Sequence, residues 1–112
     1  MFEIGNEEIA KALISAKKRG IDVKVVTDEK NADYKALREI MNNKIEVVFQ
    51  NLESYMHHKF AVIDSEIVIT GSMNWTDNDI FKNDNNVVII RSRLLAKNYL
   101  SEFYQMFYQK RF

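Results

Sequence analysis

The chain has 112 residues, 46% of them hydrophobic, and its 16 basic residues balance its 16 acidic ones. One domain over residues 1–112 is therefore expected, and zero net charge confines any nucleic-acid-binding groove to a local basic patch. The chain has no cysteine, which excludes disulfides and thiolate metal sites, and no apolar run of membrane-spanning or signal-peptide type. These features favour a cytoplasmic protein.

Helices and strands are expected to alternate through the first half of the chain. Asn6 is suited to cap a helix that ends at Gly20, because its amide oxygen can accept a hydrogen bond from an unpaired backbone N–H. A strand over 21–27, a helix over 32–42 and a strand over 45–49 follow. Strand, helix and strand in this order predict two parallel strands joined by a right-handed crossover. The second helix is expected to bury Tyr34, Leu37 and Met41.

The second half is expected to hold a hairpin, a polar segment, a strand and a long helix. Pairs of apolar residues flank a polar turn at residues 64–66, so two short strands joined tightly are predicted there. An apolar strand over 86–90 leads to a final helix capped by Ser92. The segment 75–84 is polar and irregular, and its acids are interpreted as solvated loop residues: Asp77, Asp79 and, at its end, Asp84.

The residues that best indicate chemistry begin just before the hairpin. Side chains alternate across a strand, so His57 and Lys59 are expected to point to one face and His58 to the other. An imidazole can act as a nucleophile or transfer a proton, and an ammonium can pair with a phosphate oxygen. The pair of His57 and Lys59 therefore suits a phosphate group.

Further candidate residues follow the hairpin directly. Gly71 permits a close approach of the backbone to a ligand, while Ser72 and Asn74 supply a hydroxyl and an amide. Neutral groups of this kind can fix the geometry of a phosphate whose charge is met by Lys59. The two groups of residues together predict one phosphate-binding site.

Six positions at fixed offsets within eighteen residues resemble the HKD motif of the phospholipase D superfamily, in its small single-motif, endonuclease-like branch. They run His57-x-Lys59, four residues, Asp64, six residues, and Gly71-Ser72-x-Asn74. The resemblance covers nearly the whole chain and implies an α/β fold with a mixed β-sheet flanked by helices on both faces. Family members usually begin with a strand, whereas only residues 1–5 precede the first helix here, so that N-terminal strand is expected to be missing.

The resemblance also implies a phosphodiesterase that works through a phosphohistidine intermediate. His57 would attack phosphorus, while Lys59 and Asn74 would hold the phosphate oxygens. A second imidazole must protonate the leaving oxygen from the opposite side, and His58 is expected to face away from that position. A homodimer is therefore expected, in which two copies of His57 meet in one active site at the two-fold axis.

Neither a metal nor another cofactor is expected at this site. Carboxylates do not cluster around His57 in the sequence, and lysines can supply the positive charge instead. Asp64 is the third letter of the motif, but alternation places it on the face of His58. It is interpreted as a structural residue of the turn.

One position departs from the family pattern. Relatives carry a glutamate in the run that matches residues 83–86, and this chain has Asn85 at that place. That acid would accept a hydrogen bond from the catalytic imidazole and favour its charged form, whereas Asn85 can accept the bond without adding charge. Weakened or tuned activity is the expectation.

Three functions fit these residues. The leading prediction is a metal-independent nuclease acting on DNA or RNA, because the sequence offers no membrane anchor and no basic amphipathic helix. The alternatives are a hydrolase of a phospholipid such as cardiolipin, and a catalytically weak nucleic-acid-binding module. The motif itself does not separate the substrates, because it contacts only the phosphate.

Overall fold

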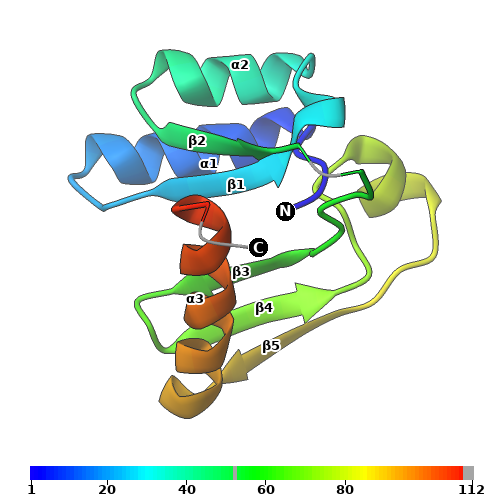
Figure 1. Cartoon of the computed structure of the whole chain (residues 1–112). Helices are drawn as coiled ribbons and strands as arrows, with labels where there is room; N and C mark the ends of the chain where they lie inside the picture. Colours follow the sequence, from blue (N-terminus) through cyan, green and yellow to red (C-terminus); the bar gives the residue numbers. More distant parts are fainter. Residues whose placement is uncertain (52, 110–112) are drawn as a thin grey trace.

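The computed structural model describes residues 1–51 and 53–109, which form an α/β fold with strands in two sheets (Figure 1). A two-stranded sheet has the order β1-β2, and a three-stranded sheet has the order β3-β4-β5. In chain order the helices and strands are α1 (Glu7–Lys18), β1 (Lys24–Asp28), α2 (Lys35–Asn42), β2 (Glu46–Gln50), β3 (Phe60–Ile63), β4 (Ile67–Gly71), β5 (Val87–Arg91) and α3 (Arg93–Phe107). The structure also has two short helical segments of other types, a 3-10 helix over Glu29–Asn31 and a π-helical turn over Asn78–Lys82.

The first half has the predicted helix and strand order, with two differences in detail. Asn6 caps α1 by accepting a hydrogen bond of 2.8 Å from the Ile9 N–H, and β1 pairs with β2 in parallel, as expected. The first strand begins at Lys24 and not at residue 21, because Ile21 follows the left-handed Gly20 and is 46% exposed. The stripe of α2 that faces the core consists of Ala36, Leu37 and Ile40, while Tyr34 and Met41 are exposed.

Two cores lie on opposite faces of β1, which explains why both faces carry helices. Val25 packs in a cluster with Leu37, Ile40 and other residues of α1 and α2, whereas its neighbour Val26 packs with Met106 and others of α3. Adjacent residues of a strand point to opposite faces, so the two clusters are separated by the strand itself. The expected helices on both faces are confirmed (Figure 1).

The hairpin and the last helix follow the local signals of the sequence. β3, β4 and β5 are antiparallel, and the β3–β4 turn has positive φ angles at Asp64 and Ser65, +56° and +54°. The Ser92 hydroxyl accepts a hydrogen bond of 3.1 Å from the Leu95 N–H and caps α3. α3 then packs against strands of both sheets.

The N-terminal residues 1–5 lie between the two sheets and join them (Figure 1). The Met1 amine donates to the carbonyl of Val26 in β1 at 2.9 Å, and the Phe2 N–H donates to the carbonyl of His58 at 2.8 Å. Further along, Ile4 forms an isolated parallel bridge with Trp75. As expected, this segment makes no full strand, yet it is the connection between the β1–β2 pair and the motif.

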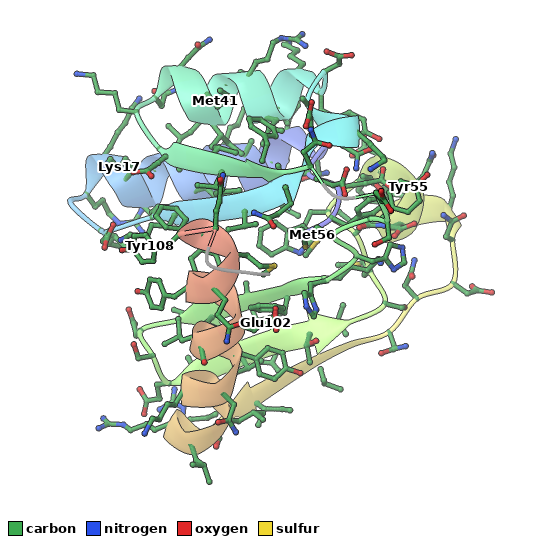
Figure 2. All side chains as sticks on the ribbon, viewed as in Figure 1. Lys17, Met41, Tyr55, Met56, Glu102 and Tyr108 are labelled. Atoms are coloured by element: carbon green, nitrogen blue, oxygen red, sulfur yellow. The ribbon has the colours of Figure 1, made fainter. Side chains whose placement is uncertain are left out.

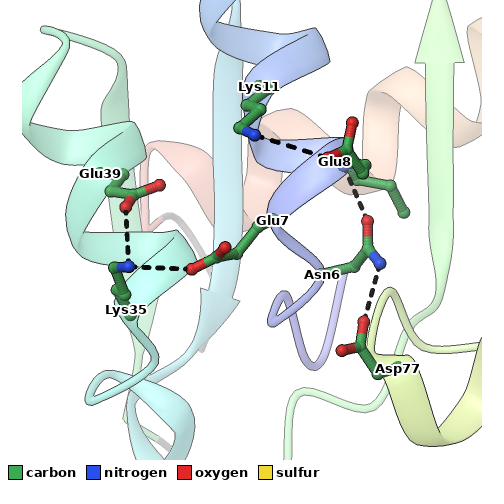
Figure 3. A network of polar contacts seen from close by, with 8 residues as sticks. Asn6, Glu7, Glu8, Lys11, Lys35, Glu39 and Asp77 are labelled. Atoms are coloured by element: carbon green, nitrogen blue, oxygen red, sulfur yellow. Dashed lines mark hydrogen bonds and ion pairs between the residues drawn. The ribbon is translucent and has the colours of Figure 1, made fainter.

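A polar network fixes the start of α1 against its neighbours (Figure 3). The Lys35 ammonium lies 3.2 Å from a carboxylate oxygen of Glu7 and 3.8 Å from one of Glu39, which links α2 to α1. The Asn6 side-chain amide donates to a carboxylate oxygen of Asp77 at 2.8 Å. The segment that follows the motif is thereby tied to the end of α1 that Asn6 caps.

Candidate active site

His57 and Lys59 lie side by side at the entry to the hairpin. The Lys59 ammonium nitrogen is 3.1 Å from each ring nitrogen of His57 and donates to the His57 carbonyl at 2.9 Å. Both residues precede β3, which begins at Phe60, so they are not within the strand as predicted. The expected pair of imidazole and ammonium is nevertheless formed.

The two histidine rings have different neighbours, as alternation predicts. The His57 ring packs against Phe2 with ring centroids 4.9 Å apart. The His58 ring meets Phe60 edge to face, and its Nε2 lies 3.8 Å from a carboxylate oxygen of Glu102 on α3. His58 is thus directed toward α3 and His57 toward the N-terminal segment.

A hollow of about 390 Å³ adjoins this pair and is bordered by both histidines. Its wall includes Lys59, Thr70 and Gly71 from the motif, and Tyr99 and Glu102 from α3. In Figure 2, Glu102 lies on α3, next to the three-stranded sheet. His58 therefore belongs to the wall of this hollow, a role that strand alternation alone did not predict.

Gly71 and Ser72 join the end of β4 to the start of β5. Gly71 has a φ of +151°, and a Cβ there would lie 2.1 Å from the Asn86 carbonyl oxygen. The Ser72 hydroxyl donates to the Asn85 side-chain oxygen at 2.9 Å and accepts from the Asn86 N–H at 3.0 Å. The close approach that requires glycine is thus to neighbouring backbone, although Gly71 also borders the hollow.

Asn74 is held in place by contacts to the backbone on two sides. It is only 9% exposed, and its side-chain oxygen accepts from the Glu3 N–H at 3.2 Å. Its own N–H donates to a carboxylate oxygen of Asp79 at 2.8 Å, and its side chain is a further hydrogen-bond partner of that carboxylate. These contacts fix Asn74 against the N-terminal segment. Its role in holding phosphate stays a prediction.

Asp79 is the functional candidate that the sequence analysis assigned to solvent. Its second carboxylate oxygen accepts from the Asn83 side-chain amide at 2.8 Å. Hydrogen bonds from Asn83 and then from the Asn74 backbone lower the pKa of Asp79 below its ordinary value, so the carboxylate is charged at neutral pH. The sequence does hold a signal for this role: the run of asparagines after the motif, whose side-chain amides need hydrogen-bond acceptors.

Asn85 and Asp64 do not contact the imidazole of His57. The Asn85 side chain accepts from Ser72 and donates to the Asp79 carbonyl at 3.1 Å, so it links these two residues. Asp64 lies in the turn between β3 and β4, at the opposite end of β3 from Lys59. The structural role of Asp64 stays a prediction.

The electrostatics of the site centre on Lys59. Partial burial lowers the pKa of its ammonium, while the negative charges of Asp79 and Glu3 act in the opposite sense. Burial, and then the charge of Lys59, lower the pKa of the Met1 amine to about 5. The Lys59 ammonium donates to the uncharged carbonyl of His57, an arrangement that suits the binding of an anion.

Over residues 1–51 and 53–109, no group of three or more histidine, aspartate or glutamate side chains is placed to hold a metal ion. Within the same part of the chain, no helix has the length and apolar character needed to cross a bilayer.

Comparison with known proteins adds three findings. The family model described as cardiolipin synthase, PLD-like domain matches residues 1–107. A mitochondrial cardiolipin hydrolase of Xenopus tropicalis is 34% identical over 108 residues, covering 92% of this chain and 50% of that protein. A phospholipase D of Rickettsia prowazekii is 37% identical over 105 residues, covering 92% of this chain and 51% of that protein. The chain therefore spans about half the length of these relatives.

A solved structure extends the likeness to three dimensions. The phospholipase D family member Nuc from Salmonella typhimurium superposes with a TM-score of 0.90 at 33% sequence identity. The match covers 96% of this chain and 74% of that one. The α/β architecture derived above is thus shared with that protein.

Proposed function

Because this chain belongs to the phospholipase D-like domain family, we propose that it is a phosphodiesterase that acts through a phosphohistidine on His57. The observation that carries the proposal is the placement of His57 and Lys59, 3.1 Å apart, beside a hollow bordered by other motif residues. An imidazole nucleophile and an ammonium at this separation can contact one phosphate group together.

The reaction has two displacements. In the first, a ring nitrogen of His57 attacks phosphorus, the bond to the leaving oxygen breaks, and a second, protonated imidazole gives that oxygen its proton. In the second, the same imidazole, now neutral, takes a proton from water while the water oxygen attacks phosphorus and releases His57. Lys59 pairs with the phosphate oxygens throughout and stabilises the charge that develops on them.

The second imidazole comes from another copy of the chain in this proposal. His58 is directed toward Glu102 and α3, whereas His57 packs against Phe2. A homodimer with the site on its two-fold axis supplies the missing group, because it brings a second His57 and Lys59 to the phosphate. His58 as the proton donor within one chain is the competing arrangement, and it is an outcome of the mutational test described in the Discussion.

We propose nucleic acid as the leading substrate class. Tyr55 is 57% exposed, its ring lies 5.4 Å from that of Phe2, and Phe2 in turn packs on His57. The Lys30 ammonium lies 4.7 Å from the centre of the Tyr55 ring. Aromatic rings and cations beside a phosphate site suit the bases and the backbone of a single strand. Figure 2 shows Tyr55 toward the outside of the molecule, whereas its buried neighbour Met56 lies in the interior.

A lipid phosphodiester is the second candidate, and the names of the relatives favour it. Mitochondrial cardiolipin hydrolase and phospholipase D are both named after lipid substrates. His57 and Lys59 would contact the phosphate of either substrate, so the choice between the two rests on the groups around them.

The test is incubation of the purified chain, in EDTA, with labelled single- and double-stranded nucleic acids and with cardiolipin vesicles. The proposal predicts cleavage of nucleic acid that is lost in His57→Ala and retained in a variant of the exposed hairpin turn such as Ser65→Ala. Cleavage of cardiolipin alone would transfer the proposal to the lipid candidate. No cleavage of either substrate by the wild type, at a protein concentration that supports a dimer, would end the proposal of a phosphodiesterase.

A further inference from the structure

Asp79 makes hydrogen bonds to several residues around the site, which is more than a solvated loop residue needs. Its two carboxylate oxygens accept from the Asn74 N–H and from the Asn83 amide, each at 2.8 Å. Its N–H donates to the Thr76 hydroxyl at 3.2 Å, and its carbonyl accepts from the Asn85 side chain at 3.1 Å. The π-helical turn over Asn78–Lys82 is what folds this residue back toward the motif.

These contacts connect the two halves of the site. On one side, Asn74 accepts from the Glu3 N–H and so anchors the N-terminal segment that carries Phe2. On the other side, Asn85 accepts from the Ser72 hydroxyl, which holds the end of β4 to the start of β5. Asp79 is the residue to which both of these asparagines bond.

Asp79 also supplies negative charge to a site whose position 85 is neutral. The charged groups that act on Lys59 are Asp79 and Glu3, while the His57 ring and the Met1 amine complete its titratable surroundings. The negative charge of Asp79, and to a smaller extent that of Glu3, opposes the lowering of the Lys59 pKa by burial. A carboxylate at this place favours the charged form of the phosphate-binding lysine.

We propose that Asp79 is the positioning acid of this site: its carboxylate and carbonyl hold Asn74 and the 83–86 segment in place around the motif. This inference rests on the proposed phosphodiesterase function for its catalytic consequence, but not for its structural and electrostatic part. The neutral Asn85 then acts as a link between Ser72 and Asp79, and the acid of the site stands six residues earlier in the chain.

The experiment compares Asp79→Asn with Asp84→Asn. Asparagine keeps the shape of Asp79 and one acceptor, so the charge is the main change. Asp84→Asn removes the same charge from an exposed position of the same segment and serves as the matched control. The first readout requires no substrate: the titration of Lys59 followed by NMR of isotope-labelled lysine side chains, assigned with Lys59→Arg.

The titration midpoint of Lys59 is expected to fall in Asp79→Asn and to stay in place in Asp84→Asn. The alkaline limb of the single-turnover pH profile should move down by the same amount. Adding Asn85→Glu to Asp79→Asn should restore part of the shift, because a carboxylate is returned to the same network.

Indistinguishable Lys59 midpoints and single-turnover pH profiles in the Asp79 and Asp84 variants would overturn the inference. A chain that cleaves no phosphodiester, yet whose Lys59 midpoint responds to Asp79→Asn alone, would count against the proposed function and support the electrostatic role of Asp79. If Asp79→Asn does not fold, Asn83→Ala, which removes one hydrogen bond to the carboxylate and leaves its charge, should raise the pKa of Asp79 and leave Lys59 charged. An unchanged Asp79 titration in that variant would also overturn the inference.

Discussion

Replacing Gly71 by alanine tests how the motif is attached to β5. The new Cβ would lie 2.1 Å from the Asn86 carbonyl oxygen, 2.9 Å from its carbonyl carbon and 3.0 Å from the Val87 Cα. These are backbone atoms, so the collision is relieved only if the ends of β4 and β5 separate. Separation would break the hydrogen bonds of 3.0 Å between Ser72 and Asn86, one in each direction.

The cost follows from two contributions. Backbone strain at a φ of +151° is about 1–3 kcal/mol for a residue with a side chain, and each lost hydrogen bond contributes about 1 kcal/mol. Gly71→Ala should therefore lower the free energy of unfolding by about 3–5 kcal/mol, a large fraction of the roughly 5–15 kcal/mol of an ordinary domain.

Urea denaturation measures this loss of stability, with Gly20→Ala as the matched control for Gly71→Ala. Gly20 has a φ of +90° and no atom within 4 Å of an added Cβ, so Gly20→Ala carries only the strain, about 1–2 kcal/mol. Gly71→Ala should be about 2 kcal/mol less stable than Gly20→Ala because of the two hydrogen bonds. Equal losses in the two variants would refute the close approach of β5 as the reason for Gly71.

Three further predictions concern the reaction. His57→Ala should lower the single-turnover rate by more than about 10²-fold, while His58→Ala should retain most of it; equal losses would favour His58 as the proton donor within one chain. Cleavage should persist in EDTA, and a rate that disappears with the chelator and returns with magnesium or zinc would contradict a site built on His57 and Lys59. Burial lowers the pKa of Lys59, so the rate should fall as pH rises through a value below the ordinary lysine pKa of about 10.4. Lys59→Arg should move that alkaline limb upward, and an unmoved limb would assign it to another group.

The elements of this fold were predictable where their signals are local. Asn6 and Ser92 cap helices as their sequence positions indicate, and the polar turn at residues 64–66 closes the predicted hairpin. The first strand was predicted three residues too early because Ile21 is apolar, yet it is exposed after Gly20. The sequence alone does not reveal that nearly half of the Ile21 side chain stays exposed.

The site was predictable in its residue types and less so in its contacts. The rings of His57 and His58 do have different neighbours, but strand alternation did not place both residues at the wall of one hollow, which depends on where α3 packs. Asp79 was missed because its contacts form only when a π-helical turn folds it back toward Asn74. Likewise, the neighbours of Asn85 are fixed by the pairing of β4 with β5, which joins residues distant in the chain.

The central claim is a covalent phosphohistidine at His57 in a site shared by two copies of the chain. Its most direct test is to mix protein and cleavable substrate in near-equal amounts, quench in alkali within one turnover, and measure the mass and position of any adduct. The account predicts an adduct on His57 in no more than one of the two copies of a dimer, and none in His57→Ala. Turnover without an adduct, or an adduct on His58, would contradict it.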